Sequence, residues 1–188
     1  MTTLLYTHPV FLEHDTGYGH PECPARLTAI LNALKHSSFA ALQWRDAPLA
    51  AIEQLTRIHT ATHVERTLSR IPKHGHYAID GDTIVSPQSG EAALRAAGAV
   101  CAAVDAILQG EADNAFCAIR PPGHHAEPNQ AMGFCLFGNA AIGAAHARAI
   151  HDLERVAVID FDVHHGNGTQ AAFEHDPAYL YASTHQAY

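Results

Sequence analysis

Two acids and a histidine stand at alternate positions directly after an apolar run late in the sequence. Residues 156–159 (Val-Ala-Val-Ile) are typical of a buried strand, and Asp160, Asp162 and His164 follow them. Alternate side chains of an extended chain point to one face, so we expect these three to lie together at the strand's C-terminal end, where open α/β sheets bind ligands. The Asp162 and His164 pair predicts a zinc site. The alternative, a strand end with a hydrogen-bonded aspartate, leaves two acids beside an apolar run without a cation.

Adjacent histidines on a stiff loop form a second candidate cluster. His124 and His125 belong to the segment Arg-Pro-Pro-Gly-His-His-Ala over residues 120–126. The prolines exclude a helix and favour an extended turn, and the glycine lets the backbone bend. Because histidine titrates near neutral pH, the pair is suited to proton transfer. The competing interpretation is a pair of surface histidines, in a chain that has 16 histidines. The cluster of Asp160, Asp162 and His164 makes that interpretation less favoured.

Strands and helices must position these two clusters, and the hydrophobic pattern of the sequence predicts where the strands and helices lie. Strands that alternate with helices favour an α/β fold with a mostly parallel sheet. Ser86 with Pro87 predicts the N-cap and first turn of a long alanine-rich helix. Residues 72–83 are predicted to be a loop. The expected strands are 4–11, 42–44, 116–119, 156–161 and 179–182, and the expected helices are 27–34 (after Pro24), 52–58, 64–71, 89–108, 139–151 and 168–173.

Composition narrows the classes of protein to consider. The 188 residues are 47% hydrophobic and 16% charged, as in one globular domain. A net charge of −8 argues against nucleic acid or an anionic membrane as the primary partner. Neither a signal-peptide pattern nor a membrane-spanning apolar run is present, so we expect a cytoplasmic protein. Whether it forms a homo-oligomer is left open.

The four cysteines are isolated from one another. No C-x-x-C pair occurs, which indicates reduced thiols rather than disulfides or a zinc knuckle. Cys135 lies close to the predicted site in sequence, but no activating partner is evident, so core packing is favoured over a nucleophilic role. The others are Cys23, Cys101 and Cys117.

Taken together, the motifs resemble the arginase/deacetylase superfamily and, within it, the histone deacetylase family. The resemblance runs along nearly the whole chain and is closest to class II and bacterial amidohydrolases, including acetylpolyamine deacetylases. It implies a three-layer α/β/α fold with a mostly parallel sheet, and a chain that forms the N-terminal part (1–188) of a single, truncated catalytic domain. The matching segments are His20–Leu27, Arg120–Ala126, Gly133–Asn139 and Asp160–Thr169.

The resemblance also implies roles for individual residues. Asp162 and His164 match two ligands of a Zn²⁺ ion. His125 matches the general base that deprotonates the attacking water and later protonates the leaving amine, and His124 matches its electrostatic partner, which hydrogen bonds to Asp160. The remaining matches are Asn167, which orients His125, and Gly133 and Phe134, which line the tunnel for the acyl-lysine.

Potassium is a further cofactor that the resemblance implies, at two sites. The first takes Asp160, Asp162, His164, Ser183 and Thr184, and the second takes Phe173, Asp176 and Tyr179.

The implied activity is zinc-dependent removal of acetyl groups from acetyl-lysine or acetylpolyamines. Two residues of the family's site have no match in this sequence: a third zinc ligand, which is an aspartate, and a tyrosine that polarises the carbonyl. Catalytic zinc usually has three protein ligands, so weak or absent activity is expected from residues 1–188 alone. Strands absent from this half should also leave unpaired edges and exposed apolar surface.

Other functions compete with this one. A non-catalytic metal-binding or interaction fragment would keep part of the site. An arginase is disfavoured by the paired histidines after Pro-Pro-Gly and by Phe134, and a serine hydrolase by the lack of a G-x-S-x-G motif. Asp82 is predicted either to hold substrate at the rim or to cap its loop. A hydrogen-bonded loop pair is favoured for His20 and Glu22 over a role in substrate entry.

Overall fold

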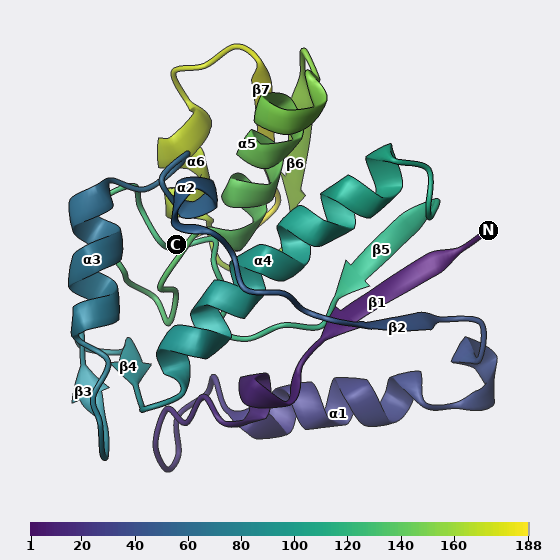
Figure 1. The fold of residues 1–188 in the computed structure, drawn as a ribbon. Helices are drawn as coiled ribbons and strands as arrows, with labels where there is room; N and C mark the ends of the chain where they lie inside the picture. Colours follow the sequence, from purple (N-terminus) through teal and green to yellow (C-terminus); the bar gives the residue numbers. More distant parts are fainter. Residues whose placement is uncertain (188) are drawn as a thin grey trace.

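The computed structural model describes residues 1–187 and contains three separate sheets (Figure 1). The largest has the parallel strand order β2 (Gln43–Asp46), β1 (Thr3–Thr7), β5 (Asn114–Cys117). Strands β6 (Val156–Asp160) and β7 (Tyr179–Ser183) form a parallel pair, and β3 (Tyr77–Ala78) and β4 (Ile84–Val85) form a short antiparallel ladder. The predicted α/β class with mostly parallel strands is confirmed, with the parallel strands in two sheets.

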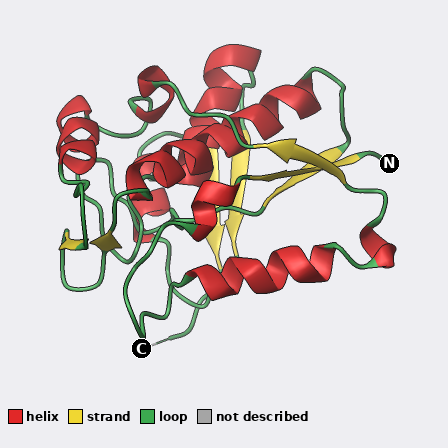
Figure 2. Cartoon of the chain, turned by 60° about the horizontal axis from the view of Figure 1, so that its bottom comes forward, coloured by secondary structure: helices red, strands yellow, loops and turns green. Residues whose placement is uncertain are grey.

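Helices cover both sides of the larger sheet. Figures 1 and 2 show α1 (Pro24–Leu34) and α4 (Ser89–Leu108) on opposite sides of β1. Leu4 and Leu5, adjacent in β1, are both fully buried because each faces one of these layers. The other helices are α2 (Ile52–Leu55), α3 (Ala61–Ser69), α5 (Asn139–His151) and α6 (Asn167–Phe173), with 3₁₀ turns at Pro9–Leu12 and Ser37–Phe39.

Small residues bring α4 and α5 close together. A Cβ atom added at Gly143 of α5 would lie 2.3 Å from Cγ1 of Val100 in α4. One added at Gly98 would lie 2.1 Å from the Pro48 carbonyl oxygen. Only glycine permits these approaches, and the small alanine side chains of α4 likewise serve close packing.

Several predicted boundaries are wrong for local reasons. The first strand ends at Thr7, because Pro9 begins a 3₁₀ turn whose N-cap is His8. Ser86 is not the N-cap of α4. It forms a turn in which its N–H donates to Ser89 Oγ at 2.8 Å, and the helix begins at Ser89. Residues 72–83 contain β3, α2 ends at Leu55, and α3 ends at Ser69.

Strands β6 and β7 are more exposed than the apolar sequence of β6 predicts. Side chains alternate between half-buried and exposed along both strands. Ile159 and Leu180 are 62% and 61% exposed. Val156 and Val158 pack instead beside Phe173 and Ala144. One face of this pair therefore presents apolar side chains to solvent, and the prediction that residues 156–159 are buried is wrong for that face.

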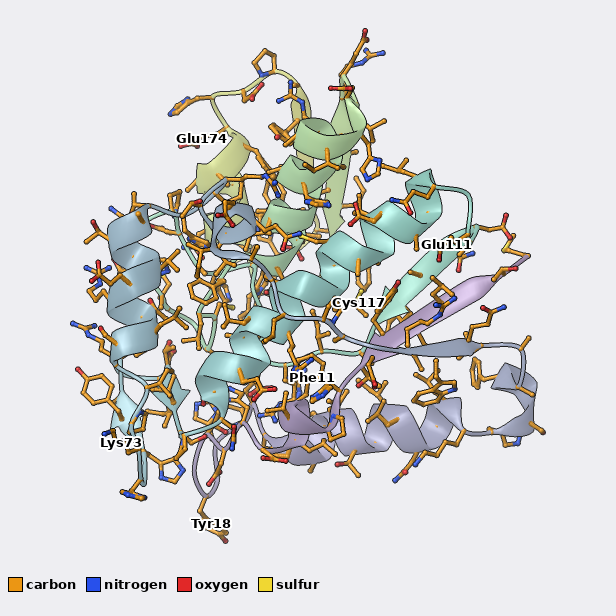
Figure 3. The ribbon with its side chains drawn as sticks, viewed as in Figure 1. Phe11, Tyr18, Lys73, Glu111, Cys117 and Glu174 are labelled. Carbon is orange, nitrogen blue, oxygen red and sulfur yellow. The ribbon has the colours of Figure 1, made fainter. Side chains whose placement is uncertain are left out.

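Loops differ widely in exposure. Figure 3 shows Phe11 inside the molecule and Tyr18 projecting from a loop tip. Phe11 is fully buried, whereas Tyr18 is fully exposed between two glycines with positive φ. Within residues 1–187, every helix is too short or too polar to cross a membrane.

Candidate active site

The two predicted clusters meet beyond the C-terminal ends of β5 and β6. His124 Nδ1 lies 2.9 Å from Asp160 Oδ2. Tyr181 donates its hydroxyl to the same oxygen at 3.3 Å. Both the His124 and Asp160 side chains are largely buried, so this hydrogen bond is shielded from water and fixes the orientation of the His124 ring.

A second hydrogen bond fixes the neighbouring histidine. Asn167 at the start of α6 places Oδ1 2.8 Å from His125 Nδ1. Its Nδ2 donates to Glu127 Oε1 at 2.9 Å. A carboxylate can only accept, so this contact sets the amide orientation, and His125 Nδ1–H must donate to Asn167. The Nε2 lone pair of neutral His125 is then free. Burial lowers the pKa of His125, and the bond to Asn167 acts in the opposite direction.

Asp162 and His164 lie together, but not because they continue the strand. Strand β6 ends at Asp160, and a turn follows. The Asp162 N–H donates to Asp160 Oδ1 at 3.1 Å, and the His164 N–H donates to Asp162 Oδ1 at 2.8 Å. The alternation argument therefore reached the correct neighbours through the wrong backbone conformation. Successive aspartate–backbone turns replace the extended chain.

The donor pair suits a zinc ion. His164 Nδ1 lies 3.1 Å from Asp162 Oδ1, close to the separation of two ligands about 2.0–2.2 Å from one tetrahedral zinc. Both side chains are half exposed and line the pocket. Burial alone would raise the pKa of Asp162, but the His164 N–H and nearby His124 lower it, so the carboxylate is ionised at neutral pH. Catalytic zinc usually has three protein ligands, and this pair would account for two of them.

The pocket in front of these groups has a volume of about 380 Å³. Phe134 and Gly133, to which the family resemblance gives a place in the tunnel, form part of its wall. Phe134 has φ +69°, an uncommon backbone conformation for a non-glycine residue, and its N–H donates to Thr83 Oγ1 at 3.1 Å. Gly133 has φ +55°, and an added Cβ would lie 2.6 Å from the His125 ring. The pocket is lined by Pro21, Glu22, Arg26, Asp82, Pro122, His124, His125, Gly133, Phe134, Asp162, Val163 and His164.

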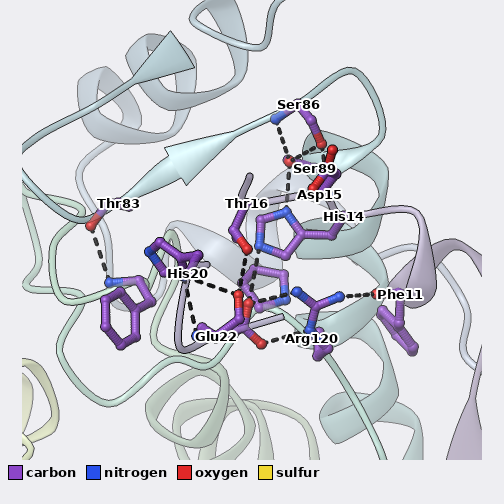
Figure 4. Close-up of polar contacts among 12 residues, drawn as sticks. Phe11, His14, Asp15, Thr16, His20, Glu22, Thr83, Ser86, Ser89 and Arg120 are labelled. Atoms are coloured by element: carbon purple, nitrogen blue, oxygen red, sulfur yellow. Dashed lines mark hydrogen bonds and ion pairs between the residues drawn. The ribbon is translucent and has the colours of Figure 1, made fainter. Parts of the chain in front are cut away.

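A buried ion pair underneath the pocket was not predicted (Figure 4). Arg120 donates to both carboxylate oxygens of Glu22, at 2.6 and 2.7 Å, and to the Phe11 carbonyl oxygen at 2.6 Å. Both side chains are almost completely buried. His14 lies beside them, with Nδ1 2.6 Å from Ser89 Oγ. The pair joins the loop at residues 20–24 to the loop that carries both histidines. Arg120 is the first residue of the segment that carries His124 and His125, and this position was the sequence signal that could have pointed to the buried pair.

The rim residues behave largely as loop-forming groups. His20 hydrogen bonds through Nδ1 to Glu22 and through Nε2 to the Asp82 carbonyl oxygen at 2.9 Å. Its ring packs edge-on against Phe134 at 4.8 Å between centroids. The prediction of a hydrogen-bonded loop pair is thus confirmed for His20 and Glu22. Asp82 also faces the pocket.

Cysteine chemistry is absent from the described part of the site. Cys135 is fully buried, and burial raises the pKa of its thiol to about 12. A thiol with this pKa is protonated at neutral pH and is a poor nucleophile. Cys135 is therefore a packing residue, as predicted, and all four cysteines are free.

The residues predicted for the first potassium site lie close together. Asp160 and Ser183 are paired across β6 and β7, and the Thr184 N–H donates to the Asp160 carbonyl oxygen at 3.0 Å. Asp162 and His164 follow in the adjacent turn. The structure therefore brings these residues together.

The residues of the second predicted potassium site are also neighbours. The Asp176 N–H donates to the Phe173 carbonyl oxygen at 3.0 Å, and the Tyr179 N–H donates to the Asp176 carbonyl oxygen at 3.1 Å. The Phe173 and Tyr179 rings stack at 4.1 Å between centroids. Binding of potassium at either place stays a prediction.

Comparison with known proteins identifies the family of this chain. Residues 20–188 match the model of the histone deacetylase domain. The chain belongs to the histone deacetylase family. It is 46% identical over 169 residues to the histone deacetylase-like amidohydrolase of Pseudomonas aeruginosa, an alignment that covers 89% of this chain and 44% of that protein. It is 39% identical over 196 residues to the human polyamine deacetylase HDAC10, covering 99% of this chain and 29% of that protein.

A solved family member has the same fold. The crystal structure of the HDA15 HD domain matches with a TM-score of 0.93 and 35% identity, over 98% of this chain and 54% of that one. The chain spans 62%, 44% and 47% of the lengths of three curated relatives that it matches. The part that this chain matches is thus about half of the length of these relatives.

Proposed function

We propose that this chain supplies the proton-transfer half of a zinc-dependent deacetylase site. One observation carries the proposal: the His125 ring, fixed by Asn167, lies 6.0 Å between centroids from the His164 ring, across the pocket from the zinc donor pair. A base therefore faces the position where a metal ion would hold water and a carbonyl group.

Asp162 and His164 would hold the zinc, together with a third ligand outside this pair. When bound, zinc acts as a Lewis acid that acidifies water and polarises an amide carbonyl. The chain's own residues do the rest. His125 Nε2 takes the proton of the attacking water and later returns it to the leaving amine, because Nδ1 is committed to Asn167. His124, paired with Asp160, stabilises negative charge that develops nearby.

The pocket supports a substrate with an apolar stem. Phe134 and Pro122 offer apolar surface beside the histidines, and Val163 extends it. The methylene groups of an acetylated lysine or polyamine would pack against such walls while the amide reaches the metal. The names of the amidohydrolase and polyamine deacetylase relatives support the same two substrate classes. The protein's net charge of −8 suits a cationic partner.

A non-catalytic metal-binding fragment is the alternative function. It is favoured by the number of zinc donors at the site, two where three are usual. The expectation of weak activity from residues 1–188 stays a prediction, and so do potassium binding and a cytoplasmic location.

Deacetylation of an acetyl-lysine peptide and of N-acetylputrescine would test the proposal on the full chain with added zinc. We expect slow product formation from at least one substrate, loss of this weak activity with a chelator, and recovery on adding zinc. His125→Ala should abolish turnover without releasing the zinc of the pocket, whereas His164→Ala should lose both turnover and that zinc. Zinc binding without turnover by the wild-type chain would favour the non-catalytic alternative. Turnover that survives His125→Ala would refute the assigned base.

A further inference from the structure

Two histidines and an aspartate that do not line the pocket converge between α4 and α5. Asp105 lies in the last turn of α4, His146 in α5, and His151 is the last residue of α5. Asp105 Oδ1 is 2.7 Å from Nε2 of His146 and 2.7 Å from Nε2 of His151. Within residues 1–187, these form the one group of three or more potential ligands close enough to share a metal ion, with all ligand atoms within 4.8 Å of one another.

The donor set suits a transition-metal dication. Two imidazole nitrogens and one carboxylate oxygen form a ligand set that zinc accepts, with a water molecule as the fourth ligand. The present N···O distances of 2.7 Å are hydrogen-bond distances. Ligands of a tetrahedral zinc lie about 3.3 Å apart, given bonds near 2.0–2.2 Å. Small side-chain rotations of Asp105 and His151 cover this difference.

Packing orders the three side chains of this cluster and leaves Asp105 accessible to an ion from solvent. The His146 and His151 side chains are 5% and 15% exposed, whereas that of Asp105 is 35% exposed. An ion can therefore enter on the Asp105 side and meet rings that the helices hold in place. Asp105 and His151 also stand at the C-terminal ends of their helices, where the helix dipole favours a cation.

Arg57 opposes metal binding and must be accounted for. Its Nη1 donates to His146 Nδ1 at 2.8 Å, so neutral His146 carries its proton on Nε2 and donates to Asp105. When an ion enters, that Nε2 proton must leave, and Nδ1 must take a proton as Arg57 turns away. Ligating histidines usually present their outer nitrogen to an acceptor rather than a donor. Arg57 therefore weakens the site.

We propose that Asp105, His146 and His151 bind a divalent transition metal such as Zn²⁺ at a second site, which Arg57 holds at reduced affinity. The site joins the C-terminal ends of α4 and α5, which pack closely at Gly143 and Val100. An ion there would cross-link the two helices and stabilise the fold. This site does not depend on the proposed deacetylase function.

Zinc binding would be measured in an Asp162→Asn/His164→Asn background, which removes the donor pair of the pocket. Purified full chain would be equilibrated with ZnCl₂, and bound zinc, affinity and thermal unfolding would be recorded. We expect one zinc per chain and a higher unfolding temperature with zinc. Asp105→Asn, which keeps the side chain's size, and His151→Gln should each weaken binding at least about tenfold.

His175→Gln is the matched control, because His175 is 91% exposed and lies outside the cluster. It should leave zinc affinity unchanged. Arg57→Glu should strengthen binding about tenfold, since a carboxylate would accept the proton on His146 Nδ1. The proposal is overturned if the background variant retains no zinc, or if Asp105→Asn and His151→Gln leave the affinity as it was. An unchanged affinity in Arg57→Glu would overturn the role given to Arg57.

Discussion

Asn167 Oδ1 accepts a hydrogen bond from His125 Nδ1–H at 2.8 Å, and Glu127 holds the Asn167 amide in that orientation. This contact selects the His125 tautomer whose Nε2 lone pair is available. Asn167→Ala should lower kcat about 10- to 100-fold with little change in KM, because the base loses its orientation while the pocket walls stay. Asn167→Asp keeps the acceptor for His125 but loses the donor to Glu127, so it should lose less activity than Asn167→Ala. Equal losses in both variants, measured by steady-state kinetics, would contradict this role.

Gly133 provides space for the His125 ring. Gly133→Ala should destabilise the fold by about 2–5 kcal/mol, from about 1–2 kcal/mol of backbone strain at positive φ and about 1–3 kcal/mol of overpacking. Activity should fall as well, because His125 must move. The control is Gly75→Ala, where φ is +67° but nothing lies within 4 Å of the added Cβ. It should show the strain alone. Chemical denaturation measures the free energy of unfolding of both variants. Equal losses of stability in Gly133→Ala and Gly75→Ala would show that the contact with His125 is unimportant.

Glu22 neutralises Arg120 inside the protein. Glu22→Gln leaves that guanidinium with an uncompensated buried charge and should lower the free energy of unfolding by about 3–5 kcal/mol. Glu91→Gln breaks the more exposed pair with Arg95, four residues along α4, and should lower it by about 0.3–0.5 kcal/mol. Urea denaturation of both variants tests the contrast. A loss below 1 kcal/mol for Glu22→Gln would show that the buried pair contributes little.

His59 should make the fold sensitive to acid. Its Nδ1 contacts the Glu127 carbonyl oxygen at 3.0 Å, and its Nε2 accepts the Gly138 N–H at 2.9 Å, so the buried ring must be neutral. Burial lowers its pKa from 6.5 to about 4. The unfolded chain therefore binds a proton that the folded chain does not, and stability present above pH 6.5 falls as the pH drops toward 4. The loss amounts to about 3 kcal/mol at pH 4.

The free energy of unfolding between pH 7.5 and pH 4.5 measures this effect. His59→Gln should flatten the dependence by up to one proton, or about 1.4 kcal/mol per pH unit. His175→Gln changes an exposed ring and should keep the wild-type slope. A wild-type slope in His59→Gln would mean that other groups account for the acid sensitivity.

Sequence alone was enough to identify the family and to select the residues that meet at the site. Local patterns carry this information: an apolar run followed by Asp160, Asp162 and His164, and a proline-stiffened pair of histidines. Helices α4 and α5 were also predicted with their observed bounds, because runs of alanine are a local signal.

Tertiary structure decided what depends on contacts between distant residues. The Glu22–Arg120 pair joins positions 98 residues apart, and the Asp105–His146–His151 cluster joins two helices. Neither leaves a local pattern. The exposure of Ile159 likewise depends on which elements cover β6, since an apolar strand has the same sequence whether one face or both are packed. Spacing along the chain predicted which residues meet at the site and what chemistry they offer, whereas the turns after β6, the burial and the long-range pairing came only with the fold.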